Sequence, residues 1–430
     1  MAGPSSETFG RKAVYVCALP GVGAFTLGAG FSQNITSLIV CRFFAGLFAS
    51  PGLSIGTAML SDFLPPEKRG APVAIFITTV QMGKDSMLFA LVESQTNIEP
   101  SYTGPILGPI IGGYVTETKN WRWTQWVILF GLALALVVTV FMSETYKAMI
   151  LKRRAKRLGV QPAPELKSSG LENVKFFVTK TITRPFYMML TEPIVALFDI
   201  YNAFNFGLLN AFFAAFSWVF VNPCITNSPV TFTDQHIDRR FQNVYGFGIG
   251  ATGLTYLGQA VGSVAGLMIV LYIYNFNWAK ENKRIKEGDS NANMAPEKRV
   301  IIAQIGAPMF PISLFWFAWT ARPDVHWISP VIAEGFFSCG NLLIFTCTGL
   351  YFTDCYGALY SASAWSSCTF IRYLAAFAFP LFVIQMYEGL GVGWATSLLG
   401  FIALALVPVP FALSRYGEHL RTRSKFSSGE

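Results

Sequence analysis

Long apolar blocks restrict the possible fold of this chain more than any other feature. They cover residues 13–32, 37–61, 105–116, 121–143, 188–218, 246–274, 300–320, 328–352, 357–383 and 392–414. A helix needs about 20 mostly apolar residues to cross a bilayer, and most of these blocks reach that length. In lipid only helices and closed barrels satisfy their own backbone, and the ten-residue alternation of a barrel is absent. The sequence therefore predicts an all-α polytopic membrane protein.

Composition supports this class and argues against several others. Only 13% of the residues are charged, whereas a soluble protein carries about a quarter. The seven cysteines and three histidines form no metal-ligand spacing and no nucleophile–histidine arrangement. There is no GxxxxGK[ST] loop for phosphate. We therefore expect no enzyme, no metal, no cofactor and no ATP-driven machine.

Positive charge is distributed unevenly along the chain, whose net charge is +8. Most lysines and arginines lie on alternate connections, above all in residues 144–187, 280–299 and the tail 415–430. The positive-inside rule places such connections in the cytoplasm, so we expect a cytoplasmic C-terminus. The basic linker is typical of a solvated loop near anionic lipid. The expected large partner is the lipid bilayer and not nucleic acid.

The basic linker also divides the chain into two helical parts. Four apolar blocks lie in residues 1–143, and six lie in 188–414 after the linker 144–187. Two helical bundles joined by a central cytoplasmic loop, with a tail at 415–430, are the predicted domain organisation.

Several motifs follow one another in an order that indicates a family. They are GPSSETFGRK (3–12), LIVCRFFAGLFASP (38–51), SDFLPPEKRG (61–70), GPILGPIIGG (104–113), TRPFYMMLTEP (183–193), PEKR (296–299) and YFTDCYGALYSASA (351–364). Together they resemble the major facilitator superfamily, and within it the fungal drug:proton antiporters and polyamine transporters. The resemblance implies a monomeric secondary transporter that exports lipophilic drugs, toxic compounds or polyamines by proton antiport with alternating access. It implies the plasma membrane, with the vacuolar membrane as the alternative.

The motif order also predicts an incomplete first bundle. In the family, a loop like GPSSETFGRK joins the second helix to the third, so about ten of twelve helices are expected here. Residues 80–103 and 221–240 interrupt the family pattern, and the first carries Lys84, Asp85, Glu93 and Glu99 where a helix is expected. Our hypothesis is that both are translated introns and that Met1 is a false start. The alternative functional prediction is therefore a non-functional or degenerate transporter, and a genuine divergent paralogue stays open.

Ionisable residues inside apolar blocks are the default functional candidates, because insertion costs roughly 2.5–3.5 kcal/mol each. Arg42 belongs to a motif that the resemblance links to proton coupling, where a buried guanidinium would respond to the protonation of a neighbouring carboxylate. A fixed buried ion pair is the alternative.

A second set of candidates lies in the later blocks. Asp199 lies roughly 13 Å into its block, near the midplane where transporter sites usually lie. Glu334 and Asn341 are seven residues apart and share a helix face, as do Trp365 and Arg372. An aromatic ring beside a carboxylate suits a lipophilic cation, although Trp365 facing lipid or packing is the alternative. The predicted substrate-binding residues are Asp199, Tyr201, Asn205, Glu334, Asn341, Trp365 and Arg372.

A third set is assigned to conformational change. Charged loop residues that pair with helix ends in one state bias alternating access, while glycine allows close helix approach and proline bends a helix. These residues are Gly3, Glu7, Gly10, Arg11, Lys12, Gly104, Pro105, Gly108, Pro109, Gly112, Gly113 and Asp354.

Overall fold

The fold was analysed in a computed structural model of the chain. The structure describes residues 11–50, 75, 112, 114–116, 118–119, 121–141, 144, 147–158, 183–220, 245, 247, 249–278, 296–422, 424 and 426. The possible inserts 80–103 and 221–240 lie outside these residues, as does most of the short block 105–116.

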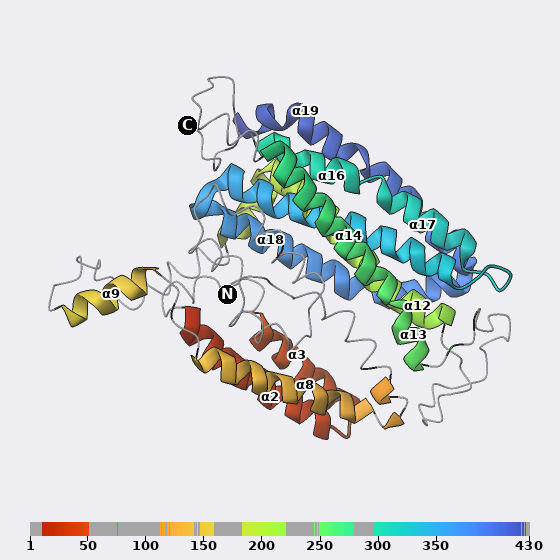
Figure 1. Cartoon of the computed structure of the whole chain (residues 1–430), viewed down its shortest axis with the longest axis horizontal. Helices are drawn as coiled ribbons and strands as arrows, with labels where there is room; N and C mark the ends of the chain where they lie inside the picture. The colour runs from red at the N-terminus through yellow and green to blue at the C-terminus, as the bar shows by residue number, and fades with distance from the viewer. Residues whose placement is uncertain are drawn as a thin grey trace.

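The first group of helices contains α2 (Arg11–Phe31), α3 (Ile35–Ala49) and α8 (Trp121–Phe141), which lie side by side in Figure 1. The Phe25 ring of α2 stacks on Phe44 and Phe48 of α3, with ring centroids 5.0 and 5.6 Å apart. The predicted basic linker contains a helix of its own, α9 (Lys147–Arg157).

The second group begins at the end of that linker and forms the larger body in Figure 1. Its elements are α11 (Arg184–Thr191), α12 (Pro193–Phe220), α13 (Ile249–Thr255), α14 (Leu257–Ile273), η4 (Tyr274–Trp278), η5 (Pro296–Val300), α16 (Ile301–Gly306), α17 (Met309–Thr320), α18 (Ile328–Leu406) and α19 (Pro408–Thr422). α12, α14 and α17 all pack against α18.

A proline separates α11 from α12. The residue before proline avoids the helical conformation, and Glu192 accordingly has φ −102° and ψ 105°. Its backbone N–H still donates to the Met188 carbonyl at 2.8 Å, which completes the last turn of α11. α12 then runs for 28 residues, about 42 Å, which is long enough to cross a bilayer.

α18 is 79 residues long, and its own contacts show that it reverses direction twice. Straight, it would measure about 118 Å. The Phe345 and Trp365 rings are nevertheless 5.1 Å apart, although 20 residues of straight helix span about 30 Å. The Tyr387 and Thr396 hydroxyls are 2.9 Å apart, on either side of Gly391 with its φ of +74°. That left-handed conformation favours glycine, so α18 supplies three antiparallel segments.

Glycines bring α14 against the first segment of α18. A Cβ added to Gly262 would lie 1.9 Å from the Gly335 carbonyl oxygen, and one on Gly258 would lie 2.4 Å from that of Val331. The two backbones therefore touch without intervening side chains, as small residues permit in membrane helices. The Ser263 and Ser338 hydroxyls hydrogen-bond across this contact at 2.6 Å.

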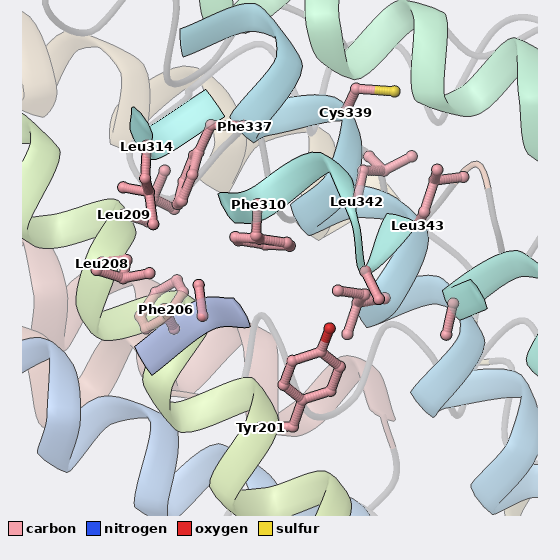
Figure 2. Packing of buried hydrophobic residues seen from close by; sticks show 14 of the residues in the cluster. Tyr201, Phe206, Leu208, Leu209, Phe310, Leu314, Phe337, Cys339, Leu342 and Leu343 are labelled. Carbon is pink, nitrogen blue, oxygen red and sulfur yellow. The ribbon is translucent and has the colours of Figure 1, made fainter. Parts of the chain in front are cut away.

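The main apolar core lies between α12, α14, α17 and α18, and Figure 2 shows part of it. Phe337 of α18 packs edge-on against Phe310, with ring centroids 4.9 Å apart. Phe212 of α12 contacts the same ring at 4.7 Å. The side chain of Tyr201 projects from α12 into this cluster.

The all-α membrane fold predicted from the sequence is confirmed. Within the residues described, seven helices are long and apolar enough to cross a membrane, and α3 is a shorter apolar helix. One of the seven, Ser363–Thr422, contains the reversal at Gly391. The predicted division into domains stays a prediction.

Candidate functional site

One end of the second helical group holds its charged side chains in pairs. The Arg299 guanidinium forms an ion pair with Asp354 of α18. Arg421 of α19 donates from Nε to Glu297 Oε1 at 3.2 Å. The Tyr356 hydroxyl donates to Glu192 Oε2 at 3.4 Å. We call this end, defined by these six residues, the paired end.

Asp199 lies one and a half turns beyond Pro193 on α12, and its side chain is 1% exposed. Neither carboxylate oxygen has a hydrogen-bond partner with acceptable geometry among the residues described, although Ser367 and Cys368 of α18 lie beside it. Its neighbour Phe198 belongs to the apolar cluster of the paired end, whereas Tyr201 belongs to the main core. Asp199 is therefore buried without an ion pair in the part of the chain that the structure describes.

Two asparagines on the same face of α12 have different surroundings. Asn202 Nδ2 donates to Thr348 Oγ1 at 2.8 Å and to the Phe198 carbonyl at 2.9 Å. One turn further, neither side-chain atom of Asn205 has a partner in the described part of the chain. The Tyr201 hydroxyl is also buried without a partner there. An unsatisfied buried polar group costs about 1–3 kcal/mol, so Asp199, Tyr201 and Asn205 form a polar set that is not needed for stability.

Arg372 lies on the second segment of α18, four residues after Cys368. Its side chain is 3% exposed. Its guanidinium carbon is 4.3 Å from the Phe345 ring centre and 4.6 Å from that of Phe206. Its Nε has no hydrogen-bond partner among the residues described. Arg372 lies one turn of α18 after Cys368, which is beside Asp199, yet Arg372 and Asp199 form no ion pair among the residues described.

Glu334 and Asn341 are both buried on the first segment of α18. The Oε2 atom of Glu334 has no partner within the described ranges. It precedes Gly335, where α14 and α18 touch. No contact joins Glu334 or Asn341 to Asp199 in the residues described, so their shared role in a substrate site stays a prediction.

Trp365 is half-buried and packs, which was the alternative to a pocket role. Its ring stacks on Phe345 and meets Phe352 edge-on. Phe345 also contacts Arg372. Trp365 therefore packs against one of the rings that surround the guanidinium.

Arg42 differs from its predicted environment. We expected a buried guanidinium beside a carboxylate, but its side chain is exposed on α3. The physical reason is that α3 buries none of its own residues and packs on α2 through phenylalanines of another part of its surface. Its proton-coupling role stays a prediction without a structural partner.

The residues predicted to control conformational change are only partly described. The Arg11 backbone N–H donates to Glu144 Oε1 at 3.0 Å, and Lys12 Nζ donates to the Val140 carbonyl at 2.7 Å. These contacts join the start of α2 to the end of α8. Asp354 pairs with Arg299 as stated. Gly112 has open space around its Cβ position. The other residues of this set lie outside the described ranges: Gly3, Glu7, Gly10, Gly104, Pro105, Gly108, Pro109 and Gly113.

Sequence reasoning missed several neighbours of the candidate residues. Arg299 is part of the PEKR motif, but its pairing with Asp354 joins positions 55 residues apart. Ser367 and Cys368 carry no signal because small polar residues are common in membrane helices. Phe206 and Phe345 look like ordinary apolar positions, and only the fold brings them to Arg372.

The chain matches the family model described as Major Facilitator Superfamily over residues 1–92 and 100–380. It is 33% identical to Polyamine transporter 4 of Saccharomyces cerevisiae, over 98% of this chain and 61% of the relative. It is 34% identical to MFS-type transporter traF of Penicillium crustosum, over 99% and 77%. It is also 34% identical to the multidrug transporter FLU1 of Candida albicans, over 99% and 63%.

Solved structures agree on the fold. The human organic anion transporter MFSD10 superimposes with a TM-score of 0.54 at 14% identity, over 96% of this chain and 79% of that chain. A peptide transporter POT gives the same TM-score and identity, over 96% and 81%. The chain spans about three fifths of the length of some curated relatives, including Polyamine transporter 4.

Proposed function

The chain belongs to the Major Facilitator Superfamily, and from this premise we propose that it exports small organic compounds in exchange for protons by alternating access. Its relatives are named as polyamine and multidrug transporters. Lipophilic drugs, toxic compounds or polyamines are therefore the proposed cargo. The chain is an integral, multi-pass membrane protein and not an enzyme.

The observation that carries this proposal is the unpaired carboxylate of Asp199. A charged group in an apolar surrounding is costly unless it is compensated. Asp199 is buried without an ion pair among the residues described, so it favours binding either a proton or a cationic group. A single carboxylate that exchanges one for the other couples proton entry to substrate exit. Tyr201 and Asn205, four residues apart on α12, offer further hydrogen-bonding atoms.

The paired end supports the alternating-access part of the proposal. Arg299–Asp354 and Arg421–Glu297 join η5, α18 and α19 at one end of the bundle. Ion pairs that form in one state and break in another bias a conformational equilibrium. We assign this end to the cytoplasmic side of the membrane, because the basic helix α9 lies in the linker that leads into it. The plasma membrane is the proposed location.

Reconstitution into proteoliposomes with an imposed pH gradient tests the proposal. Rhodamine 6G and spermidine are the two probes, and we expect gradient-driven accumulation of at least one. Asp199→Asn should abolish it, whereas the exposed matched control Asp324→Asn should not. Transport that continues without a gradient, or in the Asp199→Asn protein, would contradict the proposed coupling.

The sequence of residues 80–103 favours a second possibility, a chain that does not transport as it stands. Lys84, Asp85, Glu93 and Glu99 interrupt an apolar block there. Deleting 80–103 joins GAPVAIFITT to GPILGPIIGG in one uninterrupted block of about 20 residues. If the deletion variant transports and the full chain does not, the interrupted form is the inactive one. Equal activity of both would sink this alternative.

A further inference from the structure

Arg372 has an unusual position for an arginine in a helical core. Its side chain is 3% exposed, and arginine stays protonated in proteins. The described part of the chain gives it no hydrogen bond and no ion pair, only aromatic contacts. A buried positive charge without a counter-charge is unfavourable, so this residue costs stability in the structure as it stands.

The aromatic contacts determine how a partner can approach. Phe206 of α12 and Phe345 of α18 place their rings over the guanidinium carbon at 4.6 and 4.3 Å, and the Tyr373 ring is 5.4 Å away. The ring faces stabilise the cation electrostatically, but they do not accept conventional hydrogen bonds from its five N–H groups. The in-plane N–H groups are what remains for a ligand. A carboxylate fits that edge, because its two oxygens match the spacing of two parallel N–H donors.

Among the residues described, no carboxylate forms an ion pair with Arg372. Asp199 and Glu334 are the buried acids nearest the middle of the second group, and neither forms an ion pair among the residues described. Asp354, in contrast, is already paired with Arg299. Within the described residues the guanidinium edge of Arg372 is therefore left without a counter-charge, and a ligand can supply one.

We propose that Arg372 binds the carboxylate of the transported compound, and that the cargo is an organic acid with an apolar body. This rests on the proposed function in calling the bound compound cargo, and it replaces the cationic group proposed for Asp199 by an anionic group at Arg372. The acid group meets the guanidinium edge, and the body lies among Phe206, Phe345 and the aromatic core. Asp199 on α12 then binds the proton alone. The proposal favours organic acids over polyamines, which have no anionic group.

Binding of two matched probes tests the assignment. 4-Phenylbutyrate and its neutral isostere 4-phenylbutyramide differ in the carboxylate alone. Isothermal titration of the full chain in lipid nanodiscs should show that the acid binds about ten- to a hundredfold more tightly than the amide, as expected for a charge-assisted hydrogen bond. Arg372→Gln should remove the difference. Arg372→Lys should keep part of it, because a point charge replaces the planar fork.

The matched control is Arg322→Gln. Arg322 also contacts an aromatic ring, Trp319 at 4.9 Å, but its side chain is exposed. This variant should bind both probes like the wild type. Thermal stability separates binding from folding, because Arg372→Gln removes an uncompensated charge and should leave Tm unchanged or higher.

The result that would overturn the proposal is equal binding of acid and amide by the wild type, or absent binding of both. Preserved preference in Arg372→Gln, or a large drop in its Tm, would equally assign Arg372 a structural role. Binding is measured without a proton gradient. If the acid binds through Arg372 while no gradient drives transport, the proposed function fails and the carboxylate site remains.

Discussion

Arg299 and Arg372 belong to the same helical group, but their surroundings are opposite. Arg299 meets Asp354 at the paired end, where every acidic group named above has a partner. Among the residues described, Arg372 contacts only aromatic rings, and Asp199 forms no ion pair. The difference suggests that charge at the end of the bundle serves structure or conformational control. Charge in the middle is left uncompensated, as expected where a ligand or proton must bind.

The largest expected effect is at the paired end. Arg299→Gln leaves the largely buried Asp354 carboxylate without its partner and should destabilise the protein by about 3–5 kcal/mol. Thermal unfolding in detergent would measure the loss. The double variant Arg299→Met with Asp354→Leu should recover most of it, because no buried charge remains. A loss below about 1 kcal/mol for Arg299→Gln would remove the distinction between the two arginines.

The second effect concerns the scaffold on which Glu334 lies. Gly262→Ala places a methyl group against the Gly335 carbonyl, so α14 and α18 must separate. Overpacking of this kind costs typically about 1–3 kcal/mol. Gly389→Ala is the matched control, because no atom lies within 4 Å of the added Cβ. Equal unfolding temperatures for the two variants would show that the helices do not touch there.

The third effect compares two asparagines one turn apart on α12. Asn202→Leu removes the hydrogen bond to Thr348 and should destabilise by about 1–2 kcal/mol. Asn205→Leu removes an amide without partners and should be neutral or stabilising, while lowering transport if Asn205 contacts cargo. Thermal unfolding should show the larger loss of stability for Asn202→Leu. Vesicle transport should show the larger loss of activity for Asn205→Leu. The same order in both assays would reject the division into structural and functional polar groups.

The smallest effect is expected for Arg421→Ala. Its pairing with Glu297 is partly exposed, with 28% of the Arg421 side chain accessible, and such pairs contribute about 0–1 kcal/mol. The Tm should hardly change at low salt and not at all at high salt. A loss comparable to that of Arg299→Gln would mean that the whole paired end acts as one network.

The helical membrane fold could be predicted because its signal is local. A run of apolar residues needs no knowledge of its neighbours to indicate a span, and the predicted blocks 121–143 and 300–320 nearly coincide with α8 and with the stretch from η5 to α17. The effects of Pro193 and Gly391 are also local: Pro193 separates two helices, and Gly391 allows a turn. The order of motifs then identified the family.

The environment of each candidate residue could not be predicted, because it depends on which helices meet. Asp199 and Arg372 were selected as ionisable groups in apolar blocks, and both are buried. Arg42 was selected by the same rule and is exposed. The rule counts residues along one helix, whereas burial depends on a second helix that covers them. Trp365 illustrates the same point, since its packing against Phe345 joins two segments of α18.

The turn at Gly391 has a practical consequence for mapping the topology of this protein. The Tyr387–Thr396 hydrogen bond joins the two segments within nine residues, so the chain re-enters the bundle with almost no free backbone between them. An epitope, a glycosylation acceptor or a protease site inserted there would separate the two hydroxyls and break this hydrogen bond, even though Glu388, Gly389 and Leu390 are exposed. The connection between α17 and α18, with exposed Arg322 and Asp324, is the better place for such a reporter on the same face.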